Sequence, residues 1–164
     1  MQDILVVVDM QNDFIDGSLG TKEAVAIVDN VIAEIAKYDT KDIFATRDTH
    51  PENYLETQEG KNLPVVHCVK GTDGWQINEK VKTALKDAVV IDKPTFGSKI
   101  LAEEITKIAE KEDITVTLVG LCTDICVVSN AILLRHICRR SRSKSLLPAA
   151  QVSHRKAMKQ HWLQ

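Results

Sequence analysis

The sequence predicts an α/β protein with a three-layer α/β/α architecture and a mostly parallel central sheet. Short apolar runs alternate with longer segments that place apolar residues at helical spacing. Strands separated by helices need crossover connections, which favour a parallel sheet covered by helices on both faces. The length of 164 residues suits one domain, so we expect a single domain over residues 1–164.

Four short apolar segments are predicted to form the strands. They comprise residues 4–8 (ILVVV), 43–45, 88–91 and 114–120 (ITVTLVG). Their lengths fit strands rather than helices, and the first is followed by the polar residue Asp9. The segment after the second strand is a polar loop rich in acidic residues and histidine.

Four segments between or after these strands are predicted to be helical. They comprise residues 24–37, 81–85, 99–111 and 124–137. In the first of them, Val25, Val28, Ile32 and Ile35 are spaced so that they share one face. We expect that face to pack on the sheet.

The composition is that of an ordinary globular protein, with 44% hydrophobic and 27% charged residues. The apolar runs are too short to cross a bilayer, and the start of the chain lacks a secretory signal pattern. We therefore expect a cytoplasmic protein without a membrane partner. In that setting the four cysteines (Cys68, Cys122, Cys126 and Cys138) are expected to be thiols, and their spacing does not form a zinc tetrad.

Polar residues follow the predicted strands at the positions where ligand sites form in parallel sheets. Cys126 lies near the start of a predicted helix, where the helix dipole favours a thiolate. Asp9 follows one strand and can accept a proton, and Lys93 follows another and can stabilise an anion. A nucleophile, a base and a cation would then meet at one edge of the sheet. The alternative is that Cys126 is a small buried hydrophobic residue.

A second cluster of polar residues follows the strand at 43–45. Asp48 and His50 stand two residues apart, so an extended segment points both side chains the same way. His67 could complete a set of ligands suited to zinc, iron or manganese, with Glu59 or Glu56 as a fourth ligand. The alternative is a solvated polar loop.

Five motifs together resemble the isochorismatase-like cysteine hydrolases, and especially the nicotinamidases. They are VVVDMQNDF, TRDTHPENY, TQEGKNLPVVHC, DKPTFGS and GLCTDICVVSNA, spread over roughly residues 3–136. The resemblance implies the isochorismatase-like hydrolase fold and hydrolysis of a small amide, such as nicotinamide, to an acid and ammonia.

The resemblance also implies a role for each catalytic candidate. Cys126 would be the nucleophile that forms a thioester, Asp9 would shuttle the proton, and Lys93 would help to activate the thiol. The Leu121–Cys122 peptide bond would be cis, and the N–H groups of Cys122 and Cys126 would form an oxyanion hole.

The remaining site residues are implied in the same way. Asp48, His50 and His67 match the family's metal ligands, and the metal would hold the pyridine nitrogen of the substrate. Zinc is the first candidate for this divalent metal. Phe14 matches an aromatic residue beside the substrate. Nicotinamidases often carry Trp where this chain has Leu63, so Trp75 or Tyr54 would have to replace that wall of the pocket.

Two further functions stay open, the first because of Leu63 and the second because of the altered end of the chain. The chain could hydrolyse another small amide or an ester by the same mechanism. It could also be a catalytically impaired remnant that acts only as a binding protein. In each case we expect a homo-oligomer.

The segment from residue 135 to the end differs sharply from the rest, with eight Lys/Arg residues and no Asp or Glu. Family members continue with a strand and a Gly-Val-Thr-Pro-Glu-Ser-His segment. One set of codons for Leu146–Gln164, read two bases later, encodes AACCAGVTPESHEAALAA. We therefore interpret residues 137–164 as an atypical basic tail produced by a frameshift near Ile137–Arg140.

A basic arm that binds nucleic acid is the competing interpretation of this segment. Apart from Trp162 it lacks the aromatic residues that stack on single-stranded bases, so we expect no nucleic-acid partner. A frameshift would remove an edge strand and a covering helix, which would expose apolar surface and lower stability.

Overall fold

The computed structural model describes residues 1–137 and 141–150, the latter segment and Ile137 by their backbone only. These residues contain a five-stranded sheet in the order β3-β2-β1-β4-β5, with every neighbouring pair parallel. The strands are β1 (Gln2–Val8), β2 (Ile43–Asp48), β3 (Val89–Lys93), β4 (Ile114–Gly120) and β5 (Ser141–Ala150). The predicted α/β class and the parallel sheet are confirmed.

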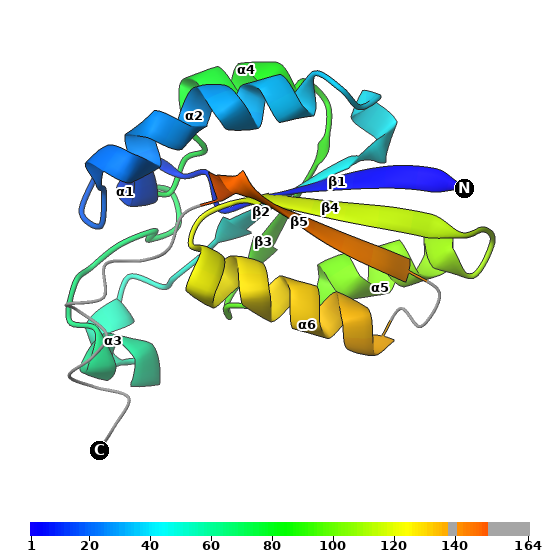
Figure 1. The fold of residues 1–164 in the computed structure, drawn as a ribbon. Helices are drawn as coiled ribbons and strands as arrows, with labels where there is room; N and C mark the ends of the chain where they lie inside the picture. The colour runs from blue at the N-terminus through cyan, green and yellow to red at the C-terminus, as the bar shows by residue number, and fades with distance from the viewer. Residues whose placement is uncertain (138–140, 151–164) are drawn as a thin grey trace.

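Helices cover both faces of the sheet, which confirms the three layers (Figure 1). Helices α2 (Lys22–Ile35) and α4 (Glu79–Leu85) lie on one face, and α5 (Lys99–Ala109) and α6 (Val128–Ile137) lie on the other. Two short helices, α1 (Asn12–Ile15) and α3 (Gln58–Asn62), lie in the loops beyond the carboxyl ends of β1 and β2. Among the described residues no helix is both long enough and apolar enough to span a membrane.

The two hydrophobic cores follow from the alternation of side chains along β1. Leu5 and Val7 pack with α2 and α4, whereas Ile4, Val6 and Val8 pack with α5 and α6. A strand buried on both faces has no polar alternation, which is why residues 4–8 are uniformly apolar.

Helix α2 buries most of the predicted face, but Val25 lies outside it. Thr21 caps the helix by accepting a hydrogen bond from the N–H of Ala24 at 3.0 Å. The buried residues are Ala24, Ile27, Val28, Val31, Glu34 and Ile35, whereas Val25 is 51% exposed and Ile32 only partly buried. The prediction was wrong for Val25 because a residue turns by about 100° along a helix, and Val25 falls beyond the edge of the buried stripe.

The segment 124–137 is helical as predicted, but its first turn is wider than an α-helix. A single π-type turn covers Thr123–Val127, and the regular α6 begins at Val128. Such turns occur frequently at functional sites.

The expected loss of an edge strand is wrong. Residues 141–150 form β5, which pairs with β4 from Ile114↔Ser141 to Leu118↔Ser145 and again at Gly120↔Ala150. A ladder is made by backbone groups, so an altered sequence can still supply it. The register breaks between Ser145 and Ala150, around Pro148, which has no N–H to donate. The predicted loss of a covering helix concerns residues 151–164, which lie outside the described residues, as does Cys138.

Candidate active site and metal group

The three candidate catalytic residues and the metal candidate Asp48 lie at the carboxyl ends of four neighbouring strands, on the left in Figure 1. Asp9 follows β1, Asp48 and Lys93 end β2 and β3, and Cys126 lies in the turn that follows β4. The order of the strands in the sheet brings together residues that are far apart in the sequence. The edge predicted from the sequence is therefore the edge at which these side chains gather.

Lys93 is the centre of the cluster. Its Nζ atom lies 2.8 Å from Asp9 Oδ2, 3.1 Å from Asp48 Oδ1 and 3.5 Å from Cys126 Sγ. The lysine is only 1% exposed, and its three partners are buried as well. Burial disfavours the ammonium, but Asp9 and the other anionic partners outweigh it and raise the pKa of Lys93. Lys93 therefore carries its charge in this buried position.

Asp9 is held in an unusual backbone conformation, with φ of +48°. Its Oδ1 atom accepts a hydrogen bond from the Thr46 hydroxyl at 2.7 Å. Burial raises the pKa of the Asp9 carboxyl, and Lys93 opposes this only in part. A raised pKa suits a group that must both accept and release a proton near neutral pH.

Cys126 is a buried thiol in the π-type turn. Burial raises the pKa of Cys126 well above the usual range, Asp9 acts in the same direction, and Lys93 opposes them. The predicted preference for a thiolate in the first turn is therefore outweighed in the resting site. Deprotonation has to be coupled to a neighbouring base.

The backbone before Cys126 matches the resemblance, since the Leu121–Cys122 peptide bond is cis. Gly120 comes just before it with φ of +120°, and a Cβ atom at this position would lie 2.1 Å from the Val8 carbonyl oxygen. Only glycine allows β4 to approach β1 this closely. The oxyanion hole of Cys122 and Cys126 N–H groups stays a prediction.

A second group of side chains adjoins the cluster through Asp48. Ligand atoms of Asp48, His50, Glu59 and His67 all lie within 4.8 Å of one another. His50 Nε2 is 3.0 Å from Asp48 Oδ2 and 3.8 Å from Glu59 Oε1, and His67 Nε2 is 3.9 Å from each of these oxygens. Glu56, the other acid considered from the sequence, instead accepts a hydrogen bond from Asn53.

The donor atoms in this group fit a divalent metal. His67 Nδ1 lies 2.7 Å from the Val65 carbonyl oxygen, so the proton belongs on Nδ1 and Nε2 is left free as a ligand. Burial lowers the pKa of His67, which favours the neutral imidazole that binds metals. His50 Nε2 is buried and has no partner in hydrogen-bond geometry, although Asp48 Oδ2 is close. Such an unsatisfied nitrogen, facing two carboxylates, is what a metal ligand requires.

Aromatic rings surround the two histidines. The buried Tyr54 ring packs 4.7 Å from His50 and 4.9 Å from His67, and its hydroxyl donates to the Leu63 carbonyl at 2.9 Å. The Phe14 ring lies 5.6 Å from His67. The structure therefore places Phe14 beside His67 and the Leu63 backbone beside Tyr54. A role for Phe14 and Leu63 in a substrate pocket stays a prediction.

Trp75 makes other contacts. Arg47 lies over its ring at 3.5 Å, and its indole N–H donates to the Thr49 hydroxyl at 2.8 Å. Arg47 also pairs with Asp92 at 2.7 Å, so the tryptophan belongs to a polar stack beside β2 and β3. A role for Trp75 in a substrate pocket stays a prediction.

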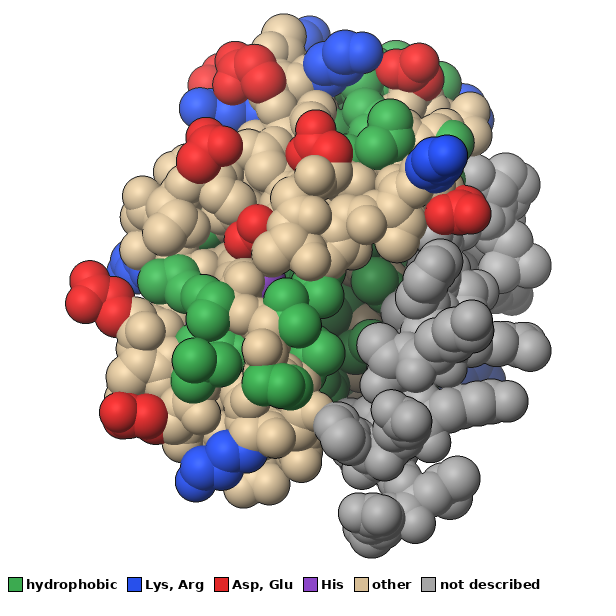
Figure 2. Space-filling model, turned by 90° about the vertical axis from the view of Figure 1, so that its left-hand side faces the viewer, with side chains coloured by type: hydrophobic (Ala, Val, Ile, Leu, Met, Phe, Trp, Pro, Cys, Tyr) green, Lys and Arg blue, Asp and Glu red, His purple; other side chains and the backbone are tan. Residues whose placement is uncertain are grey.

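Figure 2 shows the face at the carboxyl ends of the strands, where hydrophobic side chains gather and part of a histidine is visible between them. Leu55, between His50 and Glu59 in the sequence, and Val66, which directly precedes His67, are 51% and 48% exposed. An apolar rim above buried polar groups is typical of small-molecule sites.

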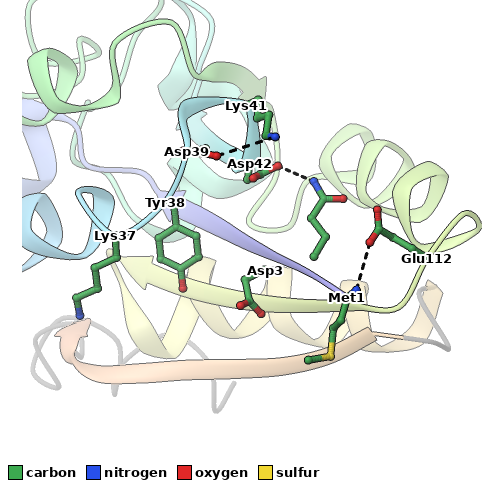
Figure 3. Close-up of a pocket in the computed structure, with 9 residues that line it drawn as sticks. Met1, Asp3, Lys37, Tyr38, Asp39, Lys41, Asp42 and Glu112 are labelled. Carbon is green, nitrogen blue, oxygen red and sulfur yellow. Dashed lines mark hydrogen bonds and ion pairs between the residues drawn. The ribbon is translucent and has the colours of Figure 1, made fainter.

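A hollow of about 810 Å³ lies at the opposite edge of the sheet, near the amino end of β1 (Figure 3). None of the candidate residues lines it. Several of its charges are paired locally, for example Met1 with Glu112 at 3.5 Å and Lys41 with Asp39 at 4.0 Å. We assign no function to this hollow.

Sequence reasoning missed several residues that support the site. Thr46 stands two residues before Asp48, a spacing that puts both on one face of β2 and could have revealed it. Asn130 lies four residues after Cys126, and its side chain donates to the Cys126 carbonyl at 2.8 Å. Gln11 bonds to the Asp48 backbone, a contact between distant segments that sequence spacing cannot reveal.

Comparison with known proteins gives consistent matches. Residues 3–135 match the isochorismatase domain family. The nicotinamidase of Schizosaccharomyces pombe is 27% identical over 173 residues, which cover 80% of this chain and 76% of the relative.

Two solved structures illustrate the structural similarity. The pyrazinamidase of Pyrococcus horikoshii in complex with zinc has a TM-score of 0.73 and 28% identity, covering 96% of this chain and 90% of that one. The N-carbamoylsarcosine amidase of Thermoplasma acidophilum has a TM-score of 0.71 and 28% identity, covering 95% and 86%. The chain is thus similar, over most of its length, to amidases named for different substrates.

Proposed function

Because the chain belongs to the isochorismatase family, we propose that it is a cysteine-dependent amidohydrolase of the nicotinamidase type. It would convert nicotinamide or a similar small amide to the acid and ammonia. The observation that carries this proposal is the position of Lys93, which contacts Asp9, Cys126 and the metal-group residue Asp48 at once. Nucleophile, base and metal group therefore form one continuous site.

In the first half of the reaction, Cys126 Sγ attacks the amide carbonyl carbon while its proton passes to the Asp9 carboxylate. The raised pKa of Cys126 means that this transfer accompanies the attack. The C–N bond then breaks, Asp9 gives the proton to the leaving nitrogen, and ammonia departs. The product of this half is a thioester on Cys126.

In the second half, Asp9 accepts a proton from a water molecule, whose oxygen attacks the thioester carbonyl. The C–S bond breaks, the acid is released, and the proton returns to Cys126. Lys93 stabilises the anionic states of Asp9 and Cys126 throughout because its charge is held between them. The N–H groups of Cys122 and Cys126 are our candidates for binding the carbonyl oxygen.

Asp48, His50 and His67 would hold a divalent metal, with Glu59 as the candidate fourth ligand and zinc as the first candidate ion. When bound, this ion supplies a Lewis acid that can hold a heteroaromatic ring nitrogen of the substrate. Phe14 and Leu63 would then contact the ring. Tyr54 fixes the loop of Leu63 through its hydrogen bond and limits the pocket on the side of the histidines.

A second candidate is an amidase of the same mechanism that acts on another small amide. Leu63 favours it, since this position often carries a tryptophan in nicotinamidases. The N-carbamoylsarcosine amidase and the pyrazinamidase are equally similar to this chain in sequence, at 28% identity each, so identity does not decide the substrate.

The test is ammonia release from a panel containing nicotinamide, pyrazinamide and N-carbamoylsarcosine, with metal content measured on the same sample. We expect turnover of nicotinamide that Cys126→Ala abolishes. Cys122→Ala serves as a matched control for the loss of a nearby thiol, because only the backbone of Cys122 has a proposed role. Turnover restricted to another amide would favour the second candidate, and ammonia release that survives Cys126→Ala would contradict the mechanism.

A further inference from the structure

Gln11 is a buried residue, 0% exposed, whose side chain is bonded entirely to backbone groups of other segments. Its Nε2 atom donates to the carbonyls of Asp48 at 2.8 Å and Trp75 at 2.9 Å, and its Oε1 accepts the N–H of Asp48 at 2.7 Å. A primary amide has two N–H donors, and both are used here. Gln11 therefore hydrogen-bonds to both the backbone N–H and the backbone carbonyl of Asp48, the last residue of β2.

This contact replaces a missing part of the sheet. The β1–β2 ladder ends at Val8↔Thr46, and the chain then turns at Asp9. The backbone of Gln11 pairs instead with Ile77 in an antiparallel bridge. Without the Gln11 side chain, the buried N–H and C=O of Asp48 would lose these partners, which costs free energy.

Asp13 makes a corresponding contact with the loop that carries His67. Its Oδ2 atom accepts the N–H of Cys68 at 2.7 Å. Cys68 directly follows His67, has φ of +46°, and accepts the N–H of His50 on its carbonyl at 2.9 Å. The Cys68 backbone thus connects the segment of His67 with the segment of His50, and Asp13 binds the N–H of Cys68 from a third segment.

The surroundings of Asp13 fix its orientation. Its own N–H donates to the Gly74 carbonyl at 3.0 Å, and a Cβ atom at Gly74 would lie 2.1 Å from Asp13 Oδ2. The N–H of Ser18 donates to Oδ1 at 3.3 Å. The carboxylate is held by both oxygens and has no room to move toward Gly74.

We propose that Gln11 and Asp13 are positioning residues of the metal group. They belong to one short segment of the chain and contact the backbone beside two different ligands, Asp48 and His67. This inference rests on the proposed metal site. Gln11 sets the backbone of Asp48, and Asp13 sets the backbone that follows His67, so together they fix the spacing between the two ligands. Metal ligands have to be held within about 0.5 Å of their working geometry. Loss of a residue that orients a ligand typically weakens metal affinity by about 10–100-fold.

The experiment is a Co²⁺ titration of chelator-treated protein, followed by visible absorption, for the parent and five variants. Gln11→Met and Asp13→Ala remove the two contacts, while Asp13→Asn keeps an oxygen that can accept the Cys68 N–H. Asn12→Ala is the matched control, because Asn12 lies between them and its side chain, in the contacts described, donates only to the Asp73 carbonyl. Val31→Ala, which truncates a core side chain of α2, controls for a general loss of stability. Melting of each metal-free protein is recorded in parallel.

We expect Gln11→Met and Asp13→Ala to bind Co²⁺ about 10–100-fold more weakly, with a changed absorption spectrum. Asp13→Asn should lose less than Asp13→Ala, and it provides the test if the larger changes prevent folding. Asn12→Ala and Val31→Ala should keep the parent affinity and spectrum, even though Val31→Ala lowers the melting temperature.

Parent-like affinity and spectrum in Gln11→Met and in both Asp13 variants would overturn the inference alone. So would an equal loss of affinity in Val31→Ala, since the effect would then follow stability. If the parent itself binds no Co²⁺, the proposed metal site and this inference both fail.

Discussion

Replacing Lys93 by methionine tests whether its buried charge holds the site together. At an effective dielectric constant of about 20, unit charges 2.8 and 3.1 Å apart attract each other by roughly 5–6 kcal/mol per pair. Desolvation of the ions offsets part of this, and breaking a buried pair from one side typically costs about 3–5 kcal/mol. Lys93→Met should therefore lower the free energy of unfolding by about 3–5 kcal/mol, which is roughly 6–20 °C in Tm for a chain of this size.

The assay is urea unfolding of the metal-free protein, with two further variants. Adding Asp9→Asn to Lys93→Met removes one of the stranded carboxylates, so the double variant should recover about 1–2 kcal/mol relative to Lys93→Met. Lys99→Met is the matched control, because Lys99 is exposed and its ion pair with Glu103 is long, at 3.7 Å.

The deficit of Lys93→Met should also depend on pH. Lys93 lowers the pKa of Asp9 against the larger effect of burial, so its removal raises the pKa of the folded state further above that of the unfolded state. The folded variant then binds this proton more tightly than the folded parent, so the deficit grows as pH rises from the parent's folded pKa of Asp9 to the variant's higher folded pKa. A deficit equal to that of Lys99→Met, or one that is largest in acid, would refute this account of Lys93.

Three more predictions concern single positions and the end of the chain. Thr46→Val removes the hydroxyl that donates to Asp9, so it should raise the pKa of Asp9. We expect the acidic limb of the kcat/KM profile to shift to higher pH and kcat to fall about tenfold. An unchanged pH profile would exclude a role for Thr46 in setting the pKa of Asp9. Alkylation of Cys126 by iodoacetamide, followed by peptide mass spectrometry, should keep accelerating above pH 9 because its pKa is raised; a plateau below pH 8 would contradict that. Replacing residues 146–164 by AACCAGVTPESHEAALAA should raise the melting temperature if a frameshift produced the present ending; equal midpoints, or a gene without that reading frame, would reject the hypothesis.

Much of the fold could be predicted because apolar periodicity and strand length are local properties. The strand at 114–120 has the predicted bounds, and the rule that sites form at the carboxyl ends of parallel strands brought Asp9, Lys93 and Cys126 together in advance. The exposure of Val25 could not be predicted, because the stripe of a helix that is buried depends on how the helix sits on the sheet. The strand β5 was missed because a backbone ladder needs no particular side chains.

The sequence predicted those site residues whose chemistry depends on the residue type alone. It did not predict properties that depend on contacts between distant segments. Asp48, His50 and His67 could be chosen by residue type. The raised pKa of Cys126 depends on its burial beside Asp9, and the stack of Trp75 on Arg47 depends on a loop packing against strand β2. Such properties arise only from the packed structure.

The alternation along β2 ties the chemistry to the pairing of the sheet. Phe44 packs on the side of α5 and α6, whereas Ile43 and Ala45 pack on the side of α2 and α4. Thr46 and Asp48 share the parity of Phe44, so a slip of one residue against β1 would turn both toward the other helical layer. Asp9 would lose its hydroxyl partner, and Lys93 would lose its second carboxylate. A protein with β2 shifted by one residue could keep the sheet but would lose the arrangement of Asp9, Asp48 and Lys93. The register of β2 is therefore a condition for the proposed activity.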